Sequence, residues 1–166
     1  MVKPTSTSSR RSVLALLGTA STGLVMAGCG FDPAQARTFP KSLSDAEWRK
    51  KLTKQEYYIL RKAGTERPYS SPLDKEKRNG TFICAGCDNR LFASKTKYDS
   101  RTGWPSFYQP LSGGIVKDTD YKLGYPRTEV LCADCGGHLG HVFSDGPRPT
   151  GKRYCMNGAA MDFIAA

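Results

Sequence analysis

The order of apolar and polar residues predicts a helical segment followed by a β-rich segment. Ser44 precedes Glu47 by three positions, which is the spacing of a capping box at a helix N-terminus. Thr53 and Glu56 repeat it, so two short consecutive helices are expected, the second ending with Gly64 as the left-handed residue. The side chains expected to face inwards are Trp48, Leu52, Tyr57 and Leu60.

From Pro68 onwards the pattern changes to short β-rich runs separated by turn residues. These runs are residues 81–83, 90–93, 114–116, 128–131 and 141–143. No later run has a helical pattern. We therefore expect a mainly β (α+β) domain, in which two N-terminal helices pack on a small twisted antiparallel β-structure.

The first 36 residues are predicted to be a leader and tether, with the folded domain spanning residues 37–166. Arg10 and Arg11 directly precede an apolar run, residues 13–27, which is shorter than the roughly 20 residues of a membrane-spanning helix. This arrangement favours a twin-arginine export signal and a periplasmic protein over a short buried helix.

Two cleavage positions remain open. Residues 26–29, Met-Ala-Gly-Cys, resemble a lipobox, in which Cys29 would be lipidated and become a membrane tether. Residues 34–36, Ala-Gln-Ala, would instead release a protein that begins at Arg37. The lipobox is favoured because it directly follows the apolar run.

Composition changes this picture little. The chain has 166 residues, 39% apolar and 24% charged, which is ordinary for a folded domain. Its formal net charge of +10 is spread along the sequence and forms no basic block. The charge is therefore treated as a solubility feature, and nucleic acid is not expected as a partner.

Four of the six cysteines form two CxxC pairs, Cys84 with Cys87 and Cys132 with Cys135. Four thiolates would hold one structural Zn²⁺ in a closed site. Gly86 and Gly136 are expected to let the backbone turn there. Disulfides, or a thioredoxin-type redox pair, are the alternatives in an oxidising compartment, but two matching pairs favour zinc.

Cys155 is then left without a partner. Strand alternation places Arg153 and Asn157 on its face, and the only two histidines, His138 and His141, stand in one short stretch. A cysteine with a histidine is the minimal set for thiolate chemistry with proton delivery. From these residues alone, an inert buried cysteine is an equal alternative.

Over residues 42–164 the chain resembles the B-type methionine-R-sulfoxide reductases. The stretches that carry the resemblance are residues 64–68 (GTERP), 103–107 (GWPSF), 137–143 (GHLGHVF), 145–147 (DGP) and 153–157 (RYCMN). Both CxxC pairs stand where zinc-binding members have theirs. The resemblance implies a twisted two-sheet β-fold and reduction of methionine R-sulfoxide in peptides and proteins.

The resemblance also implies roles for individual residues. Cys155 matches the nucleophile, and His141, assisted by His138, would supply protons. Trp104 matches the residue that receives the substrate methyl group, and Phe143 would close that wall. Asn157 would help to fix the pocket, and Arg153 would support the thiolate. Without the resemblance, the simpler interpretation of Trp104 would be an aromatic residue of the core.

Position 102 departs from the family pattern. Many members have a resolving cysteine directly before Gly-Trp-Pro-Ser-Phe, but here the residue is Thr102. We therefore expect a Cys155 sulfenic acid to be reduced by an external thiol, such as a thioredoxin-like protein. Two alternatives are a zinc-stabilised binding module without turnover and a thiol oxidoreductase that uses a CxxC pair. A monomer is expected.

Overall fold

The computed structural model describes residues 37–166. The expected leader, Cys29 and both cleavage motifs lie outside the described residues. In chain order the elements are α1 (Asp45–Lys51), α2 (Lys54–Lys62), η1 (Pro72–Lys75), β1 (Gly80–Cys84), β2 (Arg90–Ala93), η2 (Ser94–Thr96), β3 (Lys97–Tyr98), β4 (Ser106–Phe107), β5 (Ile115–Asp120), β6 (Arg127–Cys132), β7 (His138–Phe143), β8 (Arg153–Met156), η3 (Gly158–Ala160) and β9 (Met161–Ala165). Within this range, neither α-helix is long and apolar enough to cross a membrane.

Both α-helices begin with the predicted capping boxes. The Ser44 hydroxyl accepts a bond from the Glu47 amide, and the Glu47 carboxylate accepts one from the Ser44 amide. Thr53 and Glu56 make the same reciprocal pair at the start of α2. Two backbone donors that would lack a partner are thereby satisfied at each helix start. The side chains predicted to face inwards are all buried, namely Trp48, Leu52, Tyr57 and Leu60.

The end of α2 differs from the prediction by one residue. Ala63, not Gly64, adopts the left-handed conformation, with φ of 48°. The Gly64 amide donates to the Tyr58 carbonyl, which closes the last turn. A Cβ at Gly64 would lie 2.3 Å from the Tyr58 ring, so a larger residue there would displace this exposed ring.

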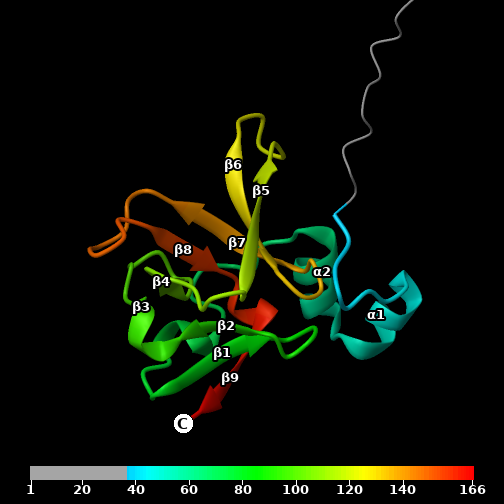
Figure 1. The fold of residues 1–166 in the computed structure, drawn as a ribbon, viewed down its shortest axis with the longest axis horizontal. Helices are drawn as coiled ribbons and strands as arrows, with labels where there is room; N and C mark the ends of the chain where they lie inside the picture. Colours follow the sequence, from blue (N-terminus) through cyan, green and yellow to red (C-terminus); the bar gives the residue numbers. More distant parts are fainter. Residues whose placement is uncertain (1–36) are drawn as a thin grey trace, which may run out of the picture. The chain divides into compact units, whose positions relative to one another are not determined.

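The strands form two antiparallel sheets, as the resemblance implied (Figure 1). One is three-stranded in the order β2-β1-β9, and the other is six-stranded in the order β3-β4-β8-β7-β6-β5. The five predicted runs lie in β1, β2, β5, β6 and β7. β8 supplies the alternation expected around Cys155, whereas β3, β4 and β9 were not predicted from the residue pattern.

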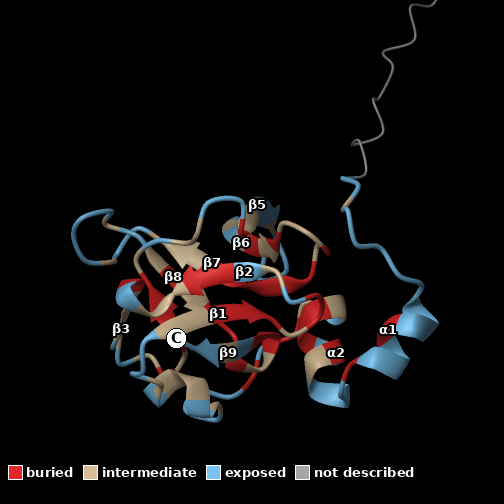
Figure 2. Ribbon diagram, turned by 60° about the horizontal axis from the view of Figure 1, so that its bottom comes forward, coloured by how far each residue is buried: buried red, intermediate tan, exposed pale blue. Residues whose placement is uncertain are grey.

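Aromatic rings from both sheets meet in the core. Phe92 of the three-stranded sheet stacks on Phe107 of the six-stranded sheet, with ring centroids 4.3 Å apart. Phe82 packs edge-on against Phe107 at 4.9 Å. All three rings are fully buried, and Figure 2 shows buried residues along β1 and β2. One face of the six-stranded sheet is thus fixed against the core, which leaves its other face for chemistry.

Candidate active site and metal centre

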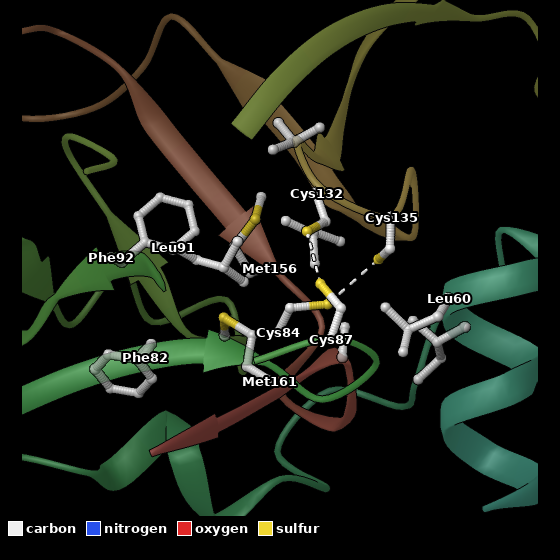
Figure 3. Close-up of a cluster of buried hydrophobic side chains, with 14 of the residues drawn as sticks. Leu60, Phe82, Cys84, Cys87, Leu91, Phe92, Cys132, Cys135, Met156 and Met161 are labelled. Carbon is white, nitrogen blue, oxygen red and sulfur yellow. Dashed lines mark hydrogen bonds between the residues drawn. The ribbon is translucent and has the colours of Figure 1, made fainter. Parts of the chain in front are cut away.

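The two CxxC pairs meet at one point between the sheets. The Sγ atoms of Cys84 and Cys135 are 3.7 Å apart, and those of Cys87 and Cys132 are 3.5 Å apart. All four sulfurs lie within 4.8 Å of one another (Figure 3). A tetrahedral Zn²⁺ with four sulfur ligands at 2.3 Å requires S···S separations of about 3.8 Å. The cluster therefore fits a structural zinc ion without rearrangement.

The turns of the two pairs are built alike. The Asp88 amide bonds the Cys84 carbonyl at 2.8 Å, and the Gly136 amide bonds the Cys132 carbonyl at 2.9 Å. Both Asp88 and Gly136 have positive φ, 62° and 67°. The expectation for Gly136 holds, but that for Gly86 is wrong, because the left-handed position is the residue after the second cysteine of each pair.

Four thiols this close cannot ionise independently. A hydrogen bond from Cys135 lowers the pKa of Cys132, whereas the bond between Cys84 and Cys132 raises the pKa of Cys84. The Asn89 side-chain amide also donates to the Cys132 sulfur at 3.5 Å. A divalent cation would remove the repulsion among thiolates, and this favours metal over four free thiols.

A row of functional side chains crosses the outer face of the six-stranded sheet. Strand register pairs Cys155 on β8 with His141 on β7, and with Ser106 on β4. His141 is paired in turn with Glu129 on β6. Directly opposed residues in antiparallel strands have Cβ atoms about 4.5–5.5 Å apart on the same face. The register alone therefore places the thiol beside the imidazole.

A cavity of about 150 Å³ opens over this row. Five of the predicted site residues line it, namely Trp104, His141, Phe143, Cys155 and Asn157. Thr65, Arg127 and Gly140 complete the lining. A larger groove of about 820 Å³, whose wall includes Tyr98 and Arg101, contains no thiol and no imidazole. The smaller cavity is the one with the chemistry expected from the sequence.

Hydroxyl groups surround the Cys155 thiol. Thr102 Oγ1 lies 3.9 Å from Cys155 Sγ and 2.8 Å from the hydroxyl of Ser100, which is 2.7 Å from that of Ser106. Burial raises the pKa of Cys155 above its ordinary value, while Thr102 and the charge of Arg153 oppose the rise. The resting thiol is thus mostly protonated, and its anion has hydroxyl donors ready to stabilise it.

His141 belongs to a charged cluster that the sequence did not suggest. Asp120 Oδ2 lies 2.8 Å from His141 Nε2 and 2.5 Å from Arg127 Nη2. Burial lowers the pKa of His141, the bond to Asp120 opposes this, and the charge of Arg127 adds to it. The Lys122 amide, together with His141 and Arg127, lowers the pKa of Asp120 to about 2. Asp120 therefore stays ionised near neutral pH, and its carboxylate holds the His141 ring in place.

Two predicted residues, His138 and Arg153, do not line the cavity. His138 is buried, with Nδ1 2.5 Å from Glu129 Oε1, and its ring lies edge-on to His141 at 5.3 Å. Arg153 makes a two-bond ion pair with Asp145, at 2.8 and 3.0 Å, and lies over the Phe143 ring. His138 can therefore act on the cavity only through a neighbour, whereas the charge of Arg153 acts on the Cys155 thiol from outside the lining.

Asn157 and Trp104 are both held in place by Glu66. This residue stands in the GTERP stretch, and no role was predicted for it. Asn157 Oδ1 accepts from the Glu66 amide, and Asn157 Nδ2 donates to the Leu139 carbonyl. Trp104 Nε1 donates to the Glu66 carbonyl at 3.2 Å. The buried Glu66 carboxylate accepts the amides of Gly158 and Ala159. One residue thus joins the Trp104 wall to the segment after Cys155.

Comparisons with known proteins show which family the chain resembles. The family model described as "SelR domain" matches residues 52–165. The chain is 55% identical over 121 residues to a peptide methionine sulfoxide reductase MsrB of Leptospira interrogans, covering 72% of this chain and 92% of that protein. It is 52% identical over 128 residues to the MsrB of Agrobacterium fabrum, covering 76% and 95%. A chloroplastic B1 reductase of Oryza sativa is 54% identical over 124 residues, covering 74% and 58%.

Proposed function

The chain belongs to the SelR-domain family of peptide methionine sulfoxide reductases, and on that premise we propose that it reduces the R epimer of methionine sulfoxide with Cys155 as nucleophile. The observation that carries the proposal is the cavity in which the Cys155 thiol, the His141 imidazole and the Trp104 ring meet. Two aromatic walls suit an S-methyl group, and the thiol and imidazole suit the sulfoxide.

The cavity contains both groups that the proposed reduction requires, a thiol that attacks the sulfoxide and an imidazole that donates protons. The Cys155 thiolate attacks the sulfoxide sulfur, and two protons delivered to the sulfoxide oxygen allow the S–O bond to break and the oxygen to leave as water. Water then attacks the Cys155 sulfur of the S–S-linked sulfonium and loses a proton; the S–S bond breaks, methionine leaves with its sulfur reduced, and Cys155 becomes a sulfenic acid. His141 is the proton donor that this geometry offers, with Asp120 and the buried His138 holding and polarising it.

The sulfenic acid needs an external thiol in this chain. Thr102, whose Oγ1 lies 3.9 Å from Cys155 Sγ, has no sulfur. One external thiol would form a mixed disulfide with Cys155 and release water. A second external thiol would then displace Cys155 as a free thiol, and the reductant would be left as a disulfide. The four clustered cysteines would be occupied by zinc, which supplies a structural clamp and no step of the reaction.

The direct test offers both epimers of a methionine sulfoxide peptide to the purified protein, with dithiothreitol and separately with thioredoxin. We expect turnover of the R epimer alone, and a slower rate with thioredoxin. Turnover of the S epimer, or no turnover by folded zinc-loaded protein, would overturn the proposal. The second result would favour a binding module.

Thr102→Cys should create an internal resolving thiol. The close approach of Thr102 to Cys155 leads us to expect a disulfide after one turnover, seen as the loss of two titratable thiols. Thioredoxin-dependent turnover should rise about tenfold or more, because the resolving step becomes intramolecular. Thr102→Ser is the matched control. If no disulfide forms between residues 102 and 155, a thiol at position 102 does not react with the Cys155 sulfenic acid, and the prediction is wrong.

Asp120→Asn should change the pH profile. Burial lowers the pKa of His141 and raises that of Cys155, so the form with both thiolate and imidazolium is a minor one at neutral pH. Below the pKa of His141, kcat/KM falls because thiolate is lost. Removing the anion lowers that pKa further, so kcat/KM at pH 7 should fall about 3–10-fold and the acid limb should move to lower pH.

Asp118→Asn is the matched control, because Asp118 is an exposed carboxylate on the same strand. It should leave both the rate and the acid limb unchanged. An acid limb that stays in place in Asp120→Asn would show that His141 does not set it.

We also propose that residues 1–36 are an export leader and that the domain therefore acts in the periplasm. We expect the domain to be a monomer. Arg10, Arg11 and the apolar run that follows support the export leader, and Cys29 would provide a lipid tether. Oxidised proteins would be the substrates, and nucleic acid is not required. Mass spectrometry of the mature N-terminus would distinguish a lipidated Cys29 from cleavage before Arg37.

A further inference from the structure

The cavity over Cys155 has a volume of about 150 Å³, and eight residues line it. A volume of this size suits one side chain better than a length of polypeptide. If the proposed function is correct, the residues on either side of an oxidised methionine must therefore lie on the surface around the cavity. The character of that surface then decides which polypeptides bind well.

Exposed apolar side chains concentrate on one loop beside the cavity. Tyr121, Leu123 and Tyr125 are 67%, 58% and 56% exposed. They occupy the tip of the β5–β6 hairpin, which projects beyond the rest of its sheet (Figure 1). Figure 2 shows the exposed surface of β5. Three large and exposed side chains on one loop are unusual, since exposed apolar groups that gather at one place commonly mark binding surfaces.

The two residues that flank this loop belong to the site around His141. Asp120 and Arg127 are paired residues at the ends of β5 and β6, and Asp120 holds His141. The loop between them is also anchored, because Lys122 Nζ donates to the Ala63 carbonyl at 3.0 Å and the Gly124 amide donates to the Tyr121 carbonyl. The loop that carries the three apolar side chains therefore begins after Asp120, which bonds His141, and ends before Arg127, which lines the cavity.

A further exposed ring lies on the Trp104 side. Tyr69 is 66% exposed, and its amide donates to the Gly103 carbonyl at 2.7 Å, next to Trp104. Its hydroxyl is bonded to the Arg101 carbonyl, so the ring is fixed. Apolar surface thus adjoins both the His141 segment and the Trp104 segment of the cavity.

We propose that the hairpin tip formed by Tyr121, Leu123 and Tyr125 binds the apolar residues that flank an oxidised methionine in an unfolded polypeptide. The proposal rests on the proposed function and names its substrate class. Methionines of a folded core have apolar neighbours, which become accessible when oxidation or unfolding exposes the segment. An apolar tip beside the cavity would select such segments over free methionine sulfoxide.

The test compares substrates with and without apolar neighbours. The variant Tyr121→Ser/Leu123→Ser/Tyr125→Ser is assayed with a short methionine R-sulfoxide peptide flanked by leucine and phenylalanine, with the same peptide flanked by serine and glycine, and with N-acetyl methionine R-sulfoxide amide. We expect kcat/KM for the apolar peptide to fall about tenfold, mainly through KM. The other two substrates should be unaffected, which also shows that the variant is folded.

Single variants give a closely matched control. Leu123→Ser should raise KM for the apolar peptide two- to threefold, whereas Ile164→Ser on β9, which is 57% exposed against 58% for Leu123, should not change it. Equal losses on all three substrates, or an unchanged apolar peptide, would overturn the inference. Failure of the unaltered protein to reduce the amide would instead overturn the proposed function.

Discussion

Cys155→Ser should abolish reduction of methionine sulfoxide while leaving the protein folded and its zinc content unchanged. The thiol stands in the cavity opposite His141, and no other cysteine of residues 37–166 lines that cavity. A serine hydroxyl does not form the anion that attacks sulfur. We expect kcat to fall at least about a thousandfold, because the nucleophile itself is removed.

Two measurements separate this loss from unfolding. In the absence of reductant, the unaltered protein should reduce a single equivalent of sulfoxide per chain, and the Cys155→Ser protein none. The thermal midpoint should change little, since serine is close to cysteine in size and the contact from Cys155 Sγ to Thr102 Oγ1 is long, at 3.9 Å. Full activity in a folded Cys155→Ser protein would show that Cys155 is not the nucleophile.

Local signals in the sequence predicted much of the fold. Ser44 and Thr53 cap helices through residues three positions away, so a short window contains the whole interaction. The CxxC pairs are equally local, because each pair is one turn. The assembly of both pairs into one cluster could be inferred as well, since four ligands are what zinc requires.

Contacts between distant segments explain what the sequence did not show. Asp120 reaches His141 only because β5, β6 and β7 pair in one particular register. The bond of Glu66 to the Gly158 amide joins segments 92 residues apart. Neither pairing leaves a spacing pattern along the chain. β3 and β4 are two residues each, too short for an alternating pattern to appear.

Removal of zinc should unfold the domain. Cys84 ends β1 in the three-stranded sheet, and Cys132 ends β6 in the six-stranded sheet, so the cluster links the two sheets across the core (Figure 3). Binding of structural zinc contributes about 10–16 kcal/mol in small zinc domains. The whole stability of a domain is about 5–15 kcal/mol, so the loss is comparable with the total.

Thermal unfolding followed by circular dichroism, with and without a strong chelator, measures this effect, and metal content is determined on the same samples. Cys132→Ser should behave like the chelated protein, because one ligand and one link between sheets are lost together. Cys155→Ser is the matched control, since it removes a thiol outside the cluster and should keep both zinc and midpoint. An unchanged midpoint in metal-free protein would mean that the aromatic core of Phe82, Phe92 and Phe107 holds the sheets together without the metal.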